Sequence, residues 1–192
     1  MKHIILSRMR FSDKELLDKY LIVTKDILIP CLKSQTNKNF IWGLIIFEEH
    51  EEYVKNYLGL DFMSFLNIDE VASYVKDNDI NIQTRHDMDD YMSSNYIEKI
   101  QNVYEDNIKK WNIFLIQSQP VRLDYHTKEE FKMGEYTNVR NSMFLSLCQS
   151  NVKHHIFERQ HGQMYEITDN IISLPEGYTK WVIHGNNKSC KL

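Results

Sequence analysis

The chain has few of the residues that interrupt or cross-link a fold: 3 prolines, 6 glycines and 3 cysteines among 192 residues. Because proline and glycine mark turns and helix ends most strongly, their scarcity leaves the predicted element boundaries loose. Cys31, Cys148 and Cys190 are widely separated and odd in number, so they indicate neither a metal-binding spacing nor a disulfide framework. This usage favours a reducing compartment, and we expect a cytoplasmic protein.

Long hydrophobic runs are also missing. The longest, such as residues 43–47, are far too short to cross a bilayer. The residues before Arg8 include only a few apolar ones and do not form a signal peptide. A formal net charge of -4 gives no bulk attraction to nucleic acid or to an anionic membrane. We therefore expect no transmembrane segment and no nucleic-acid partner.

Several common catalytic motifs are absent. The sequence contains no glycine-rich phosphate loop of either common type, which argues against a P-loop or dinucleotide-binding fold. It also has no Gly-x-Ser-x-Gly nucleophile elbow and no His-Glu-x-x-His zinc motif. None of these motifs therefore supplies a candidate site in this sequence.

Hydrophobic residues (42%) and charged residues (26%) form an ordinary globular mixture, and the length suits one domain. Apolar runs predict strands at residues 3–7, 40–47, 61–66, 80–84, 111–116, 121–123, 154–158, 171–174 and 181–184. Amphipathic patterns predict helices at residues 13–29, 48–58, 68–76, 96–108 and 141–148. We expect Pro30 to end or kink the first helix and Asn95 with Glu98 to form a capping box. The alternation predicts an α/β sandwich with a largely parallel sheet.

Three carboxylates, Asp87, Asp89 and Asp90, follow the predicted strand at residues 80–84, directly after Arg85 and His86. Residues i and i+2 of an extended segment share a face, so we expect Asp87 and Asp89 to converge. Converging oxygen ligands suit Mg²⁺ or Mn²⁺, which commonly holds a substrate phosphate as well. The alternative is a polar loop in which one aspartate caps the next helix.

Two histidines, His161 and His184, each precede a glycine just past a predicted strand. A side chain in that position can be presented to a pocket. Each histidine, taken alone, is more typical of an ordinary surface or loop residue. The pair His154–His155 on a predicted strand would point to opposite faces, which argues against joint ligation of one metal.

Four stretches carry a resemblance to a known family: Ile4-Ile5-Leu6-Ser7-Arg8; Pro30 with Ser34-Gln35-Thr36-Asn37, Phe40 and Trp42; Thr84-Arg85-His86-Asp87-Met88-Asp89-Asp90; and His184-Gly185 with Asn187. In this order they resemble the glycosyltransferase-A superfamily and, within it, the rhamnosyltransferase family. The family pattern in the third stretch is Thr-Arg-Leu-Asp-Asn-Asp-Asp. The sequence departs from it at His86 and Met88, and Glu48 stands where the family has an aspartate.

The resemblance implies one glycosyltransferase-A-like domain over residues 1–192, an α/β/α sandwich with a mostly parallel mixed sheet. Residues 1–92 would form the nucleotide-sugar-binding half, and residues 93–192 the acceptor half with the metal-completing C-terminus. The implied activity is metal-dependent transfer of a sugar from a nucleotide-diphosphate sugar to a glycan or other small acceptor. The implied alternatives are a non-catalytic sugar-nucleotide or glycan-binding relative and a metal-dependent phosphodiesterase or nucleotidyltransferase.

The resemblance also implies site residues. The Asp-x-Asp pair, Asp87 and Asp89, would hold Mn²⁺ or Mg²⁺, with His184 as third ligand and His161 as the second choice. The residues implied to bind the donor are Arg8, Arg85, Asp90 and His161. The catalytic base stays open, and so does inversion or retention of configuration; the carboxylates available in the irregular middle of the chain are Asp124, Glu129, Glu130 and Glu135.

Overall fold

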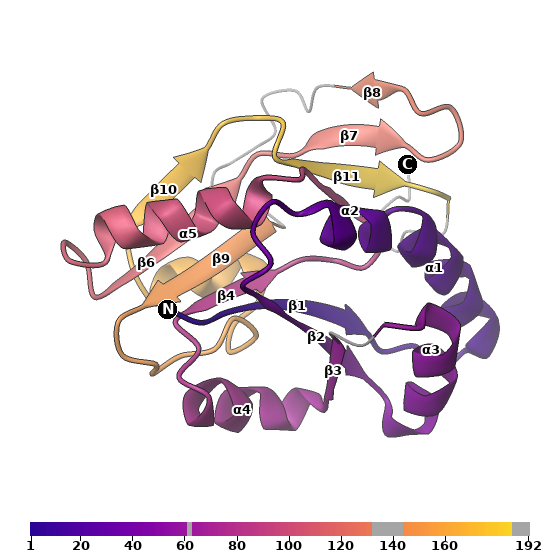
Figure 1. The fold of residues 1–192 in the computed structure, drawn as a ribbon, viewed down its shortest axis with the longest axis horizontal. Helices are drawn as coiled ribbons and strands as arrows, with labels where there is room; N and C mark the ends of the chain where they lie inside the picture. Colours follow the sequence, from indigo (N-terminus) through magenta and orange to yellow (C-terminus); the bar gives the residue numbers. More distant parts are fainter. Residues whose placement is uncertain (61–62, 132–143, 186–192) are drawn as a thin grey trace.

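A computed structural model of the protein describes residues 1–60, 63–131 and 144–185, in two sheets (Figure 1). From one edge to the other, the strands of the larger sheet are β10 (Ile171–Leu174), β6 (Ile113–Ser118), β9 (Phe144–Gln149), β4 (Ile82–Arg85), β1 (His3–Met9), β2 (Ile41–Ile46) and β3 (Met63–Leu66). The smaller sheet consists of β5 (Tyr91–Met92), β11 (Thr179–Ile183), β7 (Val121–Asp124) and β8 (Glu130–Phe131).

The larger sheet is mixed and mostly parallel. β3, β2, β1 and β4 pair in parallel, and so do β6 and β10. β9 runs antiparallel to both of its neighbours, β4 and β6. The predicted α/β class and mostly parallel sheet are therefore confirmed.

Helices cover both faces of this sheet (Figure 1). The helical elements are α1 (Lys14–Asp26), α2 (Leu28–Ser34), η1 (Glu48–His50), α3 (Glu51–Leu58), η2 (Ile68–Glu70), α4 (Val71–Asp77), α5 (Tyr96–Asn107) and η4 (His161–Glu166). Alternate residues of β1 show the two layers. Ile5 and Met9 pack with α1, α2, α3 and α5, whereas Ile4 and Leu6 pack with α4 and η4. We call these two sides the α5 face and the α4 face.

The first helix is interrupted earlier than the sequence indicates. Asp13 caps α1, since its Oδ1 accepts hydrogen bonds from the backbone N–H groups of Glu15 and Leu16 at 2.9 and 3.4 Å. The break comes at Ile27, however, and Pro30 lies in the first turn of α2. A proline is tolerated there because the first N–H groups of a helix have no intrahelical acceptor.

The helix predicted at residues 141–148 is wrong. Residues 141–143 lie outside the described residues, and Phe144–Gln149 forms β9, buried along its whole length between β4 and β6. A short apolar run that is buried on both faces has no period that separates a strand from a helix.

The predicted capping box of α5 is also wrong. Asn95 occupies the N-cap position but makes no capping hydrogen bond, and its Oδ1 accepts one from Ser93 Oγ instead. Glu98 Oε2 accepts a hydrogen bond from Thr36 Oγ1 at 2.7 Å.

The two-residue strand β5, which precedes α5, is too short to be predicted from a periodic pattern. No helix among the described residues has the length and apolar character needed to cross a membrane.

Candidate functional site

The candidate site lies where the chain changes direction across the larger sheet. After β1 the chain moves to β2 and then β3 on one side, and it returns as β4 on the other side of β1. The connections that follow β1 and β4 therefore diverge, and a crevice at such a switch point is where open α/β sheets bind ligands. Arg8 lies near the carboxyl end of β1, and Arg85 ends β4.

The aspartates after β4 do not continue the strand. Met88 and Asp89 form a turn, in which the N–H of Asp90 donates to the carbonyl of Asp87 at 3.3 Å. The extended geometry expected for Asp87 and Asp89 is therefore wrong, since a turn replaces the strand that would align them. The Asp87 side chain is 37% exposed, and its Oδ1 lies 4.0 Å from Arg85 Nε.

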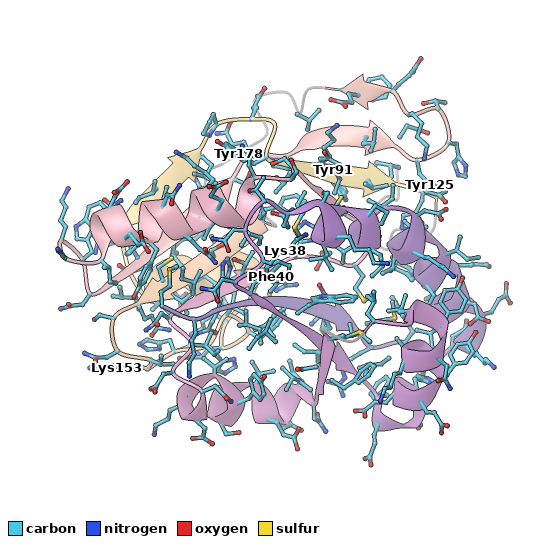
Figure 2. All side chains as sticks on the ribbon, viewed as in Figure 1. Lys38, Phe40, Tyr91, Tyr125, Lys153 and Tyr178 are labelled. Atoms are coloured by element: carbon cyan, nitrogen blue, oxygen red, sulfur yellow. The ribbon has the colours of Figure 1, made fainter. Side chains whose placement is uncertain are left out.

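Asp89 instead contacts His184 from the other end of the chain. His184 Nε2 lies 2.9 Å from Asp89 Oδ2, and the two side chains are only 1% and 10% exposed. The Tyr20 ring of α1 meets the imidazole edge-on, with ring centres 5.1 Å apart. Tyr125, just after β7 (Figure 2), has its ring centre 6.5 Å from that of His184. Two tyrosine rings therefore border the imidazole of this carboxylate–imidazole pair.

Asp90 binds β11, the strand that His184 follows. It is buried, and its Oδ1 accepts a hydrogen bond from the backbone N–H of Val182 in β11 at 2.9 Å. Because His184 follows β11 directly, this contact holds the imidazole against Asp89. Asp90 thus helps to position His184. Its predicted binding to the nucleotide-sugar donor stays a prediction.

The pair formed by Asp89 and His184 suits two ligand positions of a divalent ion. Two ligands about 2.0–2.1 Å from an octahedral ion lie about 2.9 Å apart when they are neighbours, and Mg²⁺ commonly takes its other ligands from water and substrate phosphates. The observed separation of 2.9 Å fits this geometry and is also that of a direct hydrogen bond between the two groups. Among the described residues no group of three or more metal-binding side chains occurs, so Asp87 as a further ligand stays a prediction.

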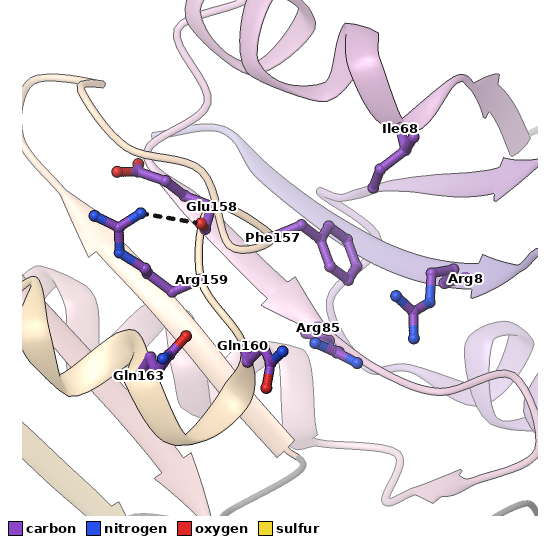
Figure 3. A pocket seen from close by; sticks show the side chains of 8 residues that line it. All are labelled: Arg8, Ile68, Arg85, Phe157, Glu158, Arg159, Gln160 and Gln163. Atoms are coloured by element: carbon purple, nitrogen blue, oxygen red, sulfur yellow. Dashed lines mark hydrogen bonds between the residues drawn. The ribbon is translucent and has the colours of Figure 1, made fainter.

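A pocket of about 650 Å³ lies at the carboxyl ends of β1 and β4, where Arg8 and Arg85 line it (Figure 3). The residues that line it are Arg8, Ile68, Arg85, Phe157, Glu158, Arg159, Gln160 and Gln163. It brings together Arg8 and Arg85, two of the residues predicted to bind the donor. Burial lowers the pKa of Arg85 to about 10, with Asp87 opposing this shift and Arg8 adding to it. Arg85 is therefore still charged at neutral pH.

Two buried glutamines hold the segment that leads into one wall of this pocket. Gln83 Nε2 donates to the His154 carbonyl and its Oε1 accepts from Ile156 N–H, both at 2.9 Å. Gln149 Nε2 donates to the same carbonyl at 2.8 Å, and its Oε1 accepts from the N–H groups of Lys153 and His154. The strand predicted at residues 154–158 is wrong, because side-chain amides replace the ladder hydrogen bonds of a strand. The premise that His154 and His155 point to opposite faces of a strand fails with it.

Six of the eight lining residues were not predicted from the sequence: Ile68, Phe157, Glu158, Arg159, Gln160 and Gln163. A signal was present, since a glutamine within an apolar strand needs a partner and Gln83 and Gln149 both bind the preceding segment. His161 begins η4, directly after Gln160, rather than following a strand. Its side chain lies outside the described residues.

The carboxylates considered as a base lie away from this pocket. Asp124 Oδ1 accepts from the backbone N–H groups of His126 and Thr127, both at 2.9 Å, and Glu130 pairs with Lys180. Glu129 is exposed at the start of the β8 hairpin strand, and Glu135 lies outside the described residues. None of the three described carboxylates lines the pocket.

Comparisons with known proteins identify the fold. No protein-family model and no curated protein sequence matches the chain. Residues 1–349 of Staphylococcus aureus TarS, in complex with UDP, align with a TM-score of 0.55 at 11% identity over 95% of this chain and 61% of that chain. A cytidylyltransferase from Leptospira borgpetersenii aligns at 0.54 and 14% identity over 91% and 76%. CMP:2-keto-3-deoxy-manno-octonic acid synthetase with CTP aligns at 0.53 and 9% identity over 92% and 91%.

At these identities the likeness concerns the fold. The chain has the glycosyltransferase-A-like α/β fold that TarS and the cytidylyltransferases share. It spans about three fifths of the TarS fragment, since it covers 61% of that chain. The finer resemblance to rhamnosyltransferases stays a prediction.

Proposed function

We propose that this protein is a metal-dependent glycosyltransferase that moves a sugar from a nucleotide-diphosphate sugar to an acceptor hydroxyl. One observation carries the proposal: the pocket lined by Arg8 and Arg85 and the pair formed by Asp89 and His184 both follow the carboxyl ends of the strands at the switch point of the sheet. A diphosphate is an anion that guanidinium groups and a divalent ion both recognise. UDP-bound TarS, which has the same fold, supports this substrate class.

The proposed chemistry divides between these groups. Asp89 and His184 would hold Mn²⁺ or Mg²⁺, which supplies Lewis-acid neutralisation of the leaving diphosphate. Arg85 directs a desolvated positive charge toward the same group, where it stabilises charge more strongly than in water. Asp87, at 4.0 Å from Arg85 Nε, orients that guanidinium. Asp90 keeps His184 in place through β11.

The experiment incubates the protein with Mn²⁺ and a panel of nucleotide sugars and measures released nucleotide. We expect slow donor hydrolysis that chelation abolishes and that Asp89→Asn lowers by orders of magnitude. The matched control is Asp106→Asn, the same change at an exposed position on α5, which should retain activity. Equal hydrolysis by both variants would remove Asp89 from the chemistry.

The same panel tests the rival functions. Nucleotide-sugar binding without turnover would indicate a non-catalytic binding protein. Formation of a nucleotide sugar from a nucleoside triphosphate, or cleavage of plain phosphodiesters, would indicate a nucleotidyltransferase or phosphodiesterase. Such sites often use two metals and need further acidic ligands, which the described residues do not gather beside Asp89.

A further inference from the structure

The pocket described above, which we call the arginine pocket, has a marked excess of positive charge. Three of its lining residues are arginines, Arg8, Arg85 and Arg159, and one is acidic. The acidic residue, Glu158, is engaged by His154, whose Nδ1 lies 2.9 Å from its carboxylate. Arg159 is half exposed, with its Nε 3.7 Å from Glu166. The other two guanidinium groups are those of Arg85 and Arg8. Among the described residues, Arg85 pairs only with the Asp87 carboxylate, at 4.0 Å, and Arg8 forms no ion pair.

Arg85 is the residue that points to a ligand. It is 8% exposed, and within the described part of the chain its buried Nε has no hydrogen-bond partner. The nearest carboxylate oxygen paired with it is on Asp87, at 4.0 Å, beyond hydrogen-bond distance. The Phe157 ring lies 5.0 Å below its guanidinium and offers no hydrogen-bond acceptor of ordinary strength. A buried donor without an acceptor is costly, and an anionic ligand would satisfy it.

The arginine pocket and the carboxylate–imidazole pair lie on different sides of the sheet edge. Arg8 and Arg85 follow Leu6 and Gln83 at a spacing of two, and those residues face α4 and the segment before Phe157. The pair instead packs against Tyr20 of α1, on the α5 face. An anion in the arginine pocket therefore contacts guanidinium groups without needing the metal ligands.

We propose that the arginine pocket is a metal-independent binding site for a phosphate group of a larger substrate, held by Arg85 with Arg8 and Arg159. The fork of a guanidinium matches two phosphate oxygens, which explains the choice of arginine. A volume of about 650 Å³ exceeds one phosphate and falls in the ordinary range for ligand sites. Ile68 and Phe157 offer apolar walls for the group that the phosphate carries (Figure 3).

This inference deepens the proposed function and rests on it for the substrate class, but phosphate binding by the pocket itself requires neither a metal nor sugar transfer. The phosphate has two possible sources, the diphosphate of the donor or a phosphate-bearing acceptor. The experiment is calorimetric titration with inorganic phosphate and inorganic pyrophosphate in excess chelator at constant ionic strength. We expect saturable binding to the wild-type protein and unchanged binding to Asp89→Asn.

The variants assign the binding to the pocket. Arg85→Gln and Arg159→Gln should each weaken pyrophosphate binding by roughly 10- to 100-fold, the range for a lost charge-assisted hydrogen bond. Arg10→Gln removes the same charge two residues from Arg8, where the side chain stacks on Phe47 outside the pocket, and should bind normally. Because Arg159 is half exposed, its variant should fold even where Arg85→Gln does not.

A competition measurement separates the two sources. Displacement of pyrophosphate by UDP, CDP or GDP in the presence of Mn²⁺ assigns the pocket to the donor, and simultaneous binding assigns it to an acceptor; both results support a phosphate site. No saturable binding in chelator, an equal loss in Arg10→Gln, or loss of binding in Asp89→Asn would overturn the proposal. The last result leaves the metal-dependent function standing, so the two failures are distinguishable.

Discussion

Gln83 provides a quantitative test of how the pocket wall is held. Replacing it by leucine keeps the size of the side chain but removes both hydrogen bonds to the segment before Phe157. The Ile156 N–H, in a buried residue, loses its acceptor, at a cost of about 1–3 kcal/mol. The His154 carbonyl keeps its bond from Gln149, so the second loss costs about 0.5–1.5 kcal/mol. We expect Gln83→Leu to lower the free energy of unfolding by about 2–4 kcal/mol.

Urea denaturation measures this change, and hydrogen exchange at the Ile156 amide reports whether the wall loosens. The matched control is Gln101→Leu, at a buried glutamine of α5 that donates to the Asn39 carbonyl at 2.9 Å and accepts from Asn37 at 2.5 Å. Both variants should be destabilised, but only Gln83→Leu should speed exchange at Ile156 beyond its effect on global stability and weaken pyrophosphate binding. The reasoning is refuted if Gln83→Leu lowers the free energy of unfolding by less than about 1 kcal/mol, which is below the net contribution of two hydrogen bonds. It is also refuted if the Ile156 amide exchanges equally fast in the two variants.

Three further predictions concern the metal, the histidines and pH. A nucleoside diphosphate should bind more tightly with Mn²⁺ than in chelator by calorimetry, and equal affinities would remove the metal from the proposed function. His184→Ala should weaken Mn²⁺-dependent nucleotide binding roughly 10- to 100-fold, and more than His161→Ala; the reverse order would move the third ligand to η4. Burial lowers the pKa of His3 to about 3, which means that the folded protein favours the neutral imidazole. This stabilisation is complete above the unfolded pKa of about 6.5 and is lost as pH falls toward 3. This predicts a loss of up to about 2 kcal/mol by about pH 5. Urea denaturation at pH 7 and pH 5 checks it, and an equal loss in His3→Asn would contradict it.

The first half of the chain could be predicted because local signals agreed with the fold. Asn67 caps η2, and Gly59 ends α3 with a positive φ of 60°, a conformation that glycine adopts at little cost. Each of these signals depends only on neighbouring residues. The same holds for β1 and β2, whose continuous apolar runs are typical of strands that helices cover on both faces.

The second half depends on contacts between distant residues, which no local pattern encodes. Asp89 and His184 lie 95 positions apart, and only the family resemblance, not a local pattern, named them together, whereas the extended strand expected to align Asp87 with Asp89 was wrong. Five of the eight residues that line the arginine pocket lie within 157–163, directly after a segment that side-chain amides from β4 and β9 position. A sequence shows the amides, but their partners become visible only in the folded chain.

The alternation of side chains along β4 explains how one strand serves both parts of the site. Gln83 and Arg85 face α4, whereas Thr84 Oγ1 lies 2.7 Å from His3 Nε2 on the α5 face. The turn after the strand then carries Asp89 to the α5 face, where it meets His184. A shift of one residue in the pairing of β4 with β1 would exchange the two faces and bury Arg85 against α5. Strand geometry therefore keeps the guanidinium and the Asp89 carboxylate from neutralising each other, so that the guanidinium stays available to an anion and the carboxylate to a cation.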